Sequence, residues 1–216
     1  MAFEATCLVR CANLTTPPPA PRRPKAHAAT VQPGLEPALA EFSQQEAALR
    51  LTSLLTDLGW TASCEVHVGG GVRRYQVYRV LVPEEQNAAA ERMMTTGWQW
   101  GRNQLLATDP ASATARHHAR RVTLARAAWQ AAMLAGGSRR RAGAMRICLA
   151  DQEMAGILVR GTCLIGVAGE LTRRPGCFVV AVSNAAVPLL TTSRLQPAIP
   201  VPARAALRGR RPQAAV

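Results

Sequence analysis

Lysine is almost absent from this 216-residue sequence: Lys25 is the only one, so arginine carries nearly all of the positive charge. Lysine and arginine together number 26 against 13 acidic residues, which gives a net charge of +13 at pH 7. An excess of this size favours polyanionic partners such as nucleic acid, anionic lipid or an acidic protein surface. A composition rich in both alanine and arginine is also what a GC-rich genome produces, so codon usage is the alternative explanation of the excess.

Acidic residues are missing from two long stretches, residues 110–150 and 171–216. The first stretch contains eight arginines and the second contains seven. The rest of the chain holds 11 basic and 13 acidic residues and is nearly neutral. The positive excess is therefore confined to these two stretches, and only a folded stretch could form a shaped binding surface.

Long apolar runs are also missing, because no stretch reaches the about 18 uninterrupted apolar residues of a spanning helix. The N-terminus lacks the apolar core of a signal peptide, so we interpret the six cysteines as reduced thiols of an intracellular protein, with the cytoplasm favoured. The alternative location is a chloroplast or mitochondrion, since the alanine-rich N-terminus contains Val9-Arg10-Cys11-Ala12, which resembles a transit-peptide cleavage site.

The composition predicts three segments along the chain. Residues 1–38 contain seven prolines and no apolar periodicity, which indicates a disordered arm or a transit peptide. Residues 39–192 are expected to form a single α+β domain. Proline and arginine return in residues 193–216, which we expect to form a disordered basic tail.

The first half of the predicted domain begins with a helix and a hairpin. A capping box of Ser43 and Glu46 predicts a helix over residues 44–58 that ends at Gly59. Alternating apolar residues on both sides of a glycine run then predict a β-hairpin. Its strands are residues 61–68 and 72–82.

The remaining elements complete an α+β fold with a long central helix and a mostly antiparallel C-terminal sheet. Pro83 predicts a helix to about residue 94, followed by a glycine-bounded loop or short strand over residues 97–102. Asp109-Pro110 and Gly136-Gly137 predict a long helix over residues 111–135. Residues 138–141 are read as a loop. Strands are predicted at residues 145–149, 156–160, 162–167 and 177–183, with 187–191 as a further candidate. No internal repeat is visible at periods of 20 to 50 residues.

Motifs for catalysis, metals and cofactors are missing as well. No C-x2-4-C pairs converge, no G-x-S-x-G is present, and the glycine-rich segments lack the strand, helix and lysine of a phosphate-binding loop. Cys148, Cys163 and Cys177 are expected in buried strands, and His118 is expected in the core. We therefore predict no catalytic residue, metal, cofactor or small-molecule substrate, and consider an enzyme the less favoured class.

Phosphate-reaching cations and aromatic planes are what the sequence does offer for nucleic-acid binding. Trp98, Trp100 and Arg102 are the stacking candidates, with burial of both tryptophans in the core as the alternative. The cationic candidates, whose alternative is a solvated helix face, are Arg116, Arg120, Arg121, Arg139, Arg140, Arg141 and Arg146.

The sequence therefore predicts a non-enzymatic nucleic-acid-binding protein that contacts the phosphate backbone, with RNA or single strands favoured. No RNA-recognition, KH, zinc-finger or homeodomain signature is present, so base readout has no support. Two alternatives stay open. One is a structural or assembly protein, such as a viral coat or an organellar complex subunit, which would be a homo-oligomer. The other is an enzyme of unknown class with a pocket around Glu65, His67 or His117.

Overall fold

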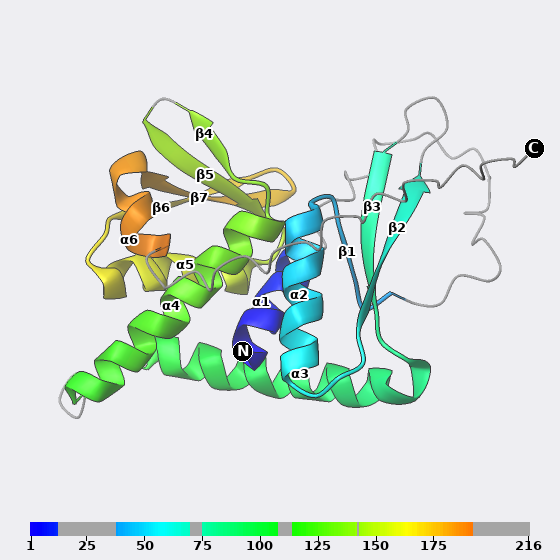
Figure 1. Ribbon diagram of the computed structural model, residues 1–216. Helices are drawn as coiled ribbons and strands as arrows, with labels where there is room; N and C mark the ends of the chain where they lie inside the picture. Colours follow the sequence, from blue (N-terminus) through cyan, green and yellow to red (C-terminus); the bar gives the residue numbers. More distant parts are fainter. Residues whose placement is uncertain (13–37, 70–74, 108–113, 142, 192–216) are drawn as a thin grey trace, which may run out of the picture.

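The two halves of the chain have a similar order of elements, except that the second half contains an additional strand, β4 (Figure 1). The structure is a computed structural model and describes residues 1–12, 38–69, 75–107, 114–141 and 143–191. The first half contains α1 (Ala2–Ala12), β1 (Ala40–Phe42), α2 (Gln45–Asp57), β2 (Ser63–Gly69), β3 (Tyr75–Leu81) and α3 (Glu84–Leu106). The second half contains α4 (Ala115–Ala135), β4 (Arg139–Arg141), β5 (Ala144–Leu149), α5 (Gln152–Ile165), β6 (Gly169–Arg174), β7 (Cys177–Ser183), the 3-10 turn η1 (Asn184–Ala186) and α6 (Val187–Thr191).

The two antiparallel sheets share one strand order. The first sheet runs β1-β3-β2, and the second runs β4-β5-β7-β6, which is the same order with β4 added at one edge. In both halves a helix precedes the hairpin and packs on the sheet, α2 in the first and α5 in the second. The α+β class with an antiparallel C-terminal sheet is confirmed, and the halves form a structural repeat that the sequence does not display.

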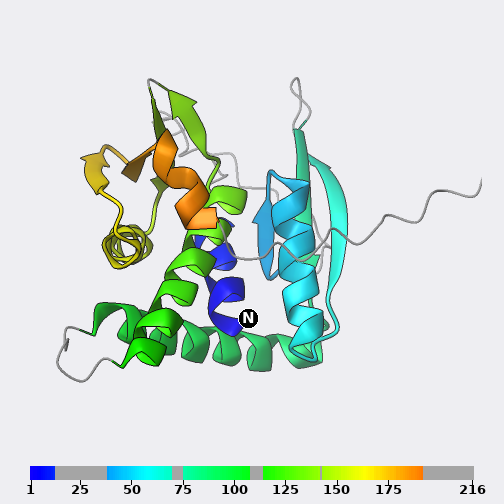
Figure 2. The same cartoon turned by 60° about the vertical axis from the view of Figure 1, so that its left-hand side comes forward.

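Helices α1 and α4 pack against each other between the two sheets. In both views the β2–β3 and β4–β5 hairpins project to one side of the molecule, away from α3 (Figures 1 and 2). The two hairpins therefore lie on a common side of the molecule, with the α1–α4 pair in the middle.

Helix α1 corrects the prediction that residues 1–38 form a disordered arm. Most of α1 is buried in the core that α2, α3 and α4 share, and Arg50 of α2 pairs with Glu4 at 2.7 Å. The proline count of the whole segment concealed this short helix, because all the prolines lie after residue 12. Residues 13–37, like the predicted tail after residue 192, lie outside the described residues. The buried side chains of α1 include Phe3, Ala5, Cys7, Leu8 and Cys11.

Helix α3 continues through residues 97–102, where the sequence predicts a loop or short strand. The glycines there allow two helices to approach closely. A Cβ on Gly97 would lie 3.2 Å from the backbone of Ala2, and one on Gly101 would lie 2.1 to 2.5 Å from the ring of Phe3. The prediction was wrong because glycine was treated as a helix breaker, whereas here it is a packing residue.

Helix α5 replaces the predicted strands at residues 156–160 and 162–167. The Asp151 side chain caps it by accepting the N–H groups of Glu153 and Met154, and Gly166 ends it in the left-handed conformation. The sequence predicted strands because β-branched residues are frequent in this segment. The buried residues of α5 nevertheless recur at helical spacing; they are Met154, Ala155, Ile157, Leu158, Gly161 and Thr162.

Other predictions hold with shifted limits. The β2–β3 hairpin, β5, β7 and the helix ending at Gly59 are confirmed, although no side chain caps the start of α2. Helix α4 begins at Ala115 with Thr114 as its cap, and residues 108–113 lie outside the described residues. Strands β4 and β6 stand where no strand was predicted, and residues 187–191 are helical. In the described part of the chain, no helix has the length and hydropathy needed to cross a membrane.

Candidate nucleic-acid interface

The four-stranded sheet has one covered face and one open face. Along β5, Met145, Ile147 and Leu149 are buried toward α5, whereas Arg146 and Cys148 alternate with them and are exposed. This alternation is typical of an antiparallel sheet with one solvated side. The strand register assigns residues of β4, β6 and β7 to the open face in the same way.

Arginines gather on this open face. Arg139 of β4 is the direct cross-strand partner of Arg146, and Arg174 of β6 lies on the same face at the β6–β7 turn. We call Arg139, Arg146 and Arg174 the arginine face. Arg140 and Arg173, whose register positions fall on the opposite side, are exposed at its borders. Arg141 belongs to β4, but its side chain is not among those described.

The Cys148 thiol lies between Arg139 and Arg174, the arginines of the two edge strands. Partial burial is the main cause that raises the pKa of Cys148, followed by the neighbouring Cys177 thiol. The guanidinium groups of Arg139 and Arg174 act in the opposite direction and lower the pKa. Arginines from opposite edges of the sheet are therefore both close enough to act on one thiol in its middle.

The arginine face has no counter-ions of its own. Among the described residues, every ion pair uses an arginine of the first half of the chain, namely Arg10, Arg50, Arg79 or Arg102. Glu170 of β6 is on the same row as Arg146 but two strands away. Like charges placed directly opposite each other destabilise a sheet. The Arg139–Arg146 pair is therefore a local cost to folding that an anionic ligand would relieve.

An open pocket of about 580 Å³ adjoins the face at the β6–β7 turn. Arg173, Arg174, Gly176 and Cys177 are among the residues that line it. Gly176 adopts a φ of +78°, which gives the turn the left-handed conformation that favours glycine. Two guanidinium groups beside an open turn suit an anion of the size of a phosphate.

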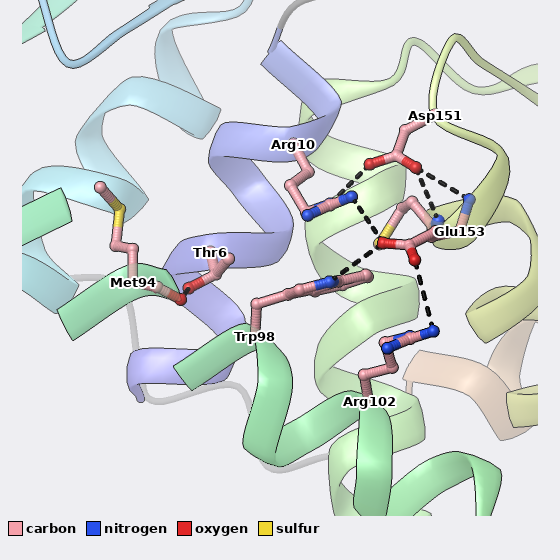
Figure 3. A network of polar contacts seen from close by, with 8 residues as sticks. Thr6, Arg10, Met94, Trp98, Arg102, Asp151 and Glu153 are labelled. Atoms are coloured by element: carbon pink, nitrogen blue, oxygen red, sulfur yellow. Dashed lines mark hydrogen bonds and ion pairs between the residues drawn. The ribbon is translucent and has the colours of Figure 1, made fainter. Parts of the chain in front are cut away.

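A second polar cluster is partly exposed, and its arginines and carboxylates compensate each other (Figure 3). Arg10 of α1 bonds Asp151 at 2.5 Å and Glu153 at 3.1 Å, and its guanidinium carbon lies 3.9 Å from the centre of the Trp98 ring. The Trp98 indole N–H and Arg102 also bond Glu153, at 3.3 and 3.4 Å. This network ties α1, α3 and the start of α5 together, so we assign it a structural role.

The three predicted stacking residues do not lie on one surface. Trp98 is buried against Phe3 at a ring distance of 5.9 Å, and Arg102 is ion-paired with Glu153, so both side chains are engaged within the protein. Trp100 lies on another side of α3, is exposed, and has the Arg120 guanidinium 4.6 Å above its ring.

The predicted helix arginines do not join the arginine face. Arg121 is buried and donates hydrogen bonds to the carbonyl oxygens of Leu105 and Ala107 at 3.1 and 2.8 Å. Its side chain therefore provides donors for carbonyl groups at the C-terminal end of α3. Arg116 and Arg120 are exposed in the first turns of α4. A helix of 21 residues is about 30 Å long, and β4 follows its far end. The candidate arginines therefore form two separate groups.

The residues considered for other chemistry are dispersed. In the described part of the chain, no three His, Cys, Asp or Glu side chains converge on a metal position. Cys148 and Cys163 are exposed, Cys177 is half-buried and His118 is exposed, so their expected burial in strands or core was wrong. Glu65, His67 and His117 line neither the pocket at the β6–β7 turn nor a second pocket beside Arg10 and Trp98.

The comparisons with known proteins give structural likeness alone. No family model matches the sequence, and no curated protein matches it. Among solved structures, the homing endonuclease I-DmoI in complex with its target DNA is 14% identical, with a TM-score of 0.49 over 91% of this chain and 97% of that one. The N-terminal LAGLIDADG domain of DUF199/WhiA is 12% identical, with a TM-score of 0.46 over 90% and 83%.

The full-length DUF199/WhiA from Thermatoga maritima is 15% identical, with a TM-score of 0.45 over 70% of this chain. The match spans 45% of the length of that protein. The likeness concerns the arrangement of helices and strands. The function proposed below rests on this chain's own residues.

Proposed function

We propose that the protein binds nucleic acid through the phosphate backbone on the open face of the β4-β5-β7-β6 sheet. The observation that carries this is the cross-strand pair Arg139 and Arg146, which shares its sheet face with Arg174 and has no ion-paired acid among the described residues. A cationic face of this kind gains affinity by releasing the counter-ions condensed on a polyanion. The single obvious cost of the arrangement, repulsion between arginines, falls when phosphates lie between them.

The sheet face favours a duplex over a single strand. Single-strand binders stack bases on aromatic side chains, and the register places no aromatic residue on the open face among the described residues. The sequence-based preference for RNA or single strands depended on stacking by Trp98, Trp100 and Arg102. Trp98 is buried, Arg102 is ion-paired with Glu153, and the exposed Trp100 belongs to α3 rather than to the sheet. We therefore replace it with a preference for double-stranded nucleic acid.

Groove dimensions further favour DNA. The B-form major groove is about 12 Å wide and admits a two-stranded β-ribbon, whereas the four strands span about 14 Å. The β4–β5 pair, which carries Arg139 and Arg146, is therefore the part of the sheet that fits the groove. The major groove of A-form RNA is deep and narrow, and side chains cannot enter it. The small residues between the arginines, such as Ala144 and Ala181, leave the backbone of the sheet open to close approach.

The test is a salt titration of binding to three ligands of equal length and arbitrary sequence: duplex DNA, duplex RNA and single-stranded DNA. Five arginines at or beside the face, each meeting one phosphate, give duplex DNA a log–log slope of about −4.5, or about a 500-fold loss of affinity between 50 and 200 mM salt. Arginines of residues 193–216 would add to this slope. We expect duplex DNA to bind most tightly at every salt concentration.

Two results would refute the proposal. One is binding that does not change with salt, and the other is single-stranded DNA binding more tightly than the duplex throughout. The alternatives of an assembly protein and of an enzyme stay predictions, and neither depends on the arginine face.

A further inference from the structure

The two sheets end in four edges, and β2 differs from the others. A free edge offers unpaired backbone N–H and C=O groups, and proteins usually protect such edges by short length or charge. Strands β1 and β4 have three residues each, and those of β4 are all arginine. Strand β6 carries Glu170, Arg173 and Arg174. Strand β2 has seven residues, with Glu65 as its only acidic or arginine residue.

Apolar side chains are exposed beside this edge. Val66 and Val68 are each 56% exposed, although they share a face with Cys64 and with the buried Val80. Helix α2 packs on this sheet, and the core on this face lies toward the Cys64 end of β2. Within the described residues, no strand pairs with the outer edge of β2. The strand therefore combines open hydrogen-bonding groups with an exposed apolar stripe.

The sequence of β2 is complementary to itself. When two copies of Ser63–Gly69 are aligned antiparallel with Val66 at the centre, Val66 meets Val66 of the second copy. Cys64 then meets Val68 of the second copy, and Glu65 meets His67. Apolar residues face apolar residues on one side, and a carboxylate faces an imidazole on the other. Cross-strand pairs of both kinds stabilise antiparallel sheets.

We propose that β2 pairs antiparallel with β2 of a second copy of this chain, joining two three-stranded sheets into one of six strands. The interface is isologous, so it closes after two copies and makes a dimer. The proposal does not depend on nucleic-acid binding. If both hold, the dimer presents two arginine faces, and a duplex long enough to reach both binds more tightly than either face alone would bind it.

The test is sedimentation velocity of the full chain, free of nucleic acid and in high salt, over a wide concentration range. We expect a reversible shift from monomer to dimer as concentration rises. Val66→Lys places two ammonium groups against each other at the dyad and should weaken the dimer by at least about tenfold. Leu171→Lys is the matched control, since Leu171 is 44% exposed on the edge strand β6 and should leave the dimer unchanged.

A charge exchange keeps the test decisive if Val66→Lys impairs folding. Glu65→Lys alone should weaken the dimer, because it places an ammonium group opposite His67 of the second copy. His67→Glu alone should also weaken it, because it places two carboxylates opposite each other. The double variant Glu65→Lys/His67→Glu should restore it, because the opposite charges face each other again. A chain that stays monomeric at all concentrations would overturn the proposal, and so would a dimer that none of these substitutions weakens.

Discussion

Arg146 on β5 stands directly opposite Arg139 on β4, on the open face of the sheet, and neither is ion-paired with an acid of the described residues. Other arginines of the described structure are compensated, by carboxylates around Arg10, Arg50 and Arg79 and by carbonyl oxygens around Arg121. The contrast indicates that the sheet arginines serve a ligand and that these four serve the fold.

Arg146→Thr is expected to separate these two roles. Removing one of two facing guanidinium groups and introducing a β-branched residue should raise the free energy of unfolding by about 0.2 to 1 kcal/mol at low salt. The same change should weaken duplex binding. Urea unfolding and a binding titration on the same preparation measure both, and a variant that loses stability would contradict this account of Arg146.

Gly101→Ala should destabilise the protein, because the added Cβ would lie 2.1 Å from the Phe3 ring at the contact between α3 and α1. Overpacking of this kind costs about 1 to 3 kcal/mol. Gly156→Ala in α5 is the control, since a Cβ there meets nothing within 4 Å and should stabilise the helix by about 0.5 to 1 kcal/mol. If both substitutions had the same sign in thermal unfolding, the close α1–α3 packing would be refuted.

Arg10→Gln should destabilise the protein by about 1 to 3 kcal/mol, because Asp151 and Glu153 lose a shared, partly buried counter-ion and Trp98 loses its cation. Arg116→Gln removes the same charge from an exposed position and should change stability by less than about 0.5 kcal/mol. Denaturant unfolding compares the two. Equal effects would mean that the network in Figure 3 contributes nothing to stability.

The thiols of α1 give a pH-dependent prediction. Burial is the main cause that raises the pKa of Cys11 to about 12 and that of Cys7 well above 9.0. The folded state then holds these protons more tightly than the unfolded state. Stability should be unaffected by these groups below pH 9 and should fall as the pH rises from 9 toward 12.

Thiol labelling at neutral pH provides a second readout of the same burial. Cys148 and Cys163 are exposed and should react in the native protein, whereas Cys7 and Cys11 should react only after unfolding. A Cys11→Ala variant should show a smaller loss of stability above pH 9. Rapid labelling of Cys7 and Cys11 in the native state would place α1 outside the core.

Local sequence patterns were enough to predict one hairpin and the ends of two helices. The alternation around Val66 and Val80 gave the β2–β3 hairpin with its register faces, and Gly59 and Gly136 gave the ends of α2 and α4. Helix α1, the second half of α3 and helix α5 were missed. The prolines of residues 13–38 concealed α1. The glycines of α3 are explained by its close contact with α1, and a contact of that kind is not visible in a single sequence. The β-branched residues of α5 favoured strands.

The candidate site was predicted only in part. Arg139, Arg140 and Arg146 were named, but their convergence depends on the pairing of β4 with β5, in a segment read as a loop. Arg173 and Arg174 were not named as binding residues. The signal that could have found them is Pro175-Gly176, a turn dipeptide between residues 169–174 and 177–183, which together form a hairpin.

The salt dependence of duplex DNA binding in two charge-matched variants tests whether the arginine face binds the phosphate backbone. Arg139→Gln/Arg146→Gln removes the facing pair, and Arg92→Gln/Arg116→Gln removes two exposed arginines of α3 and α4. We expect the first variant to reduce the log–log salt slope by about 1.8 and to weaken binding, while the second leaves the slope unchanged. Equal slopes in the two variants would show that binding follows net charge, and the arginine face would then have no special role.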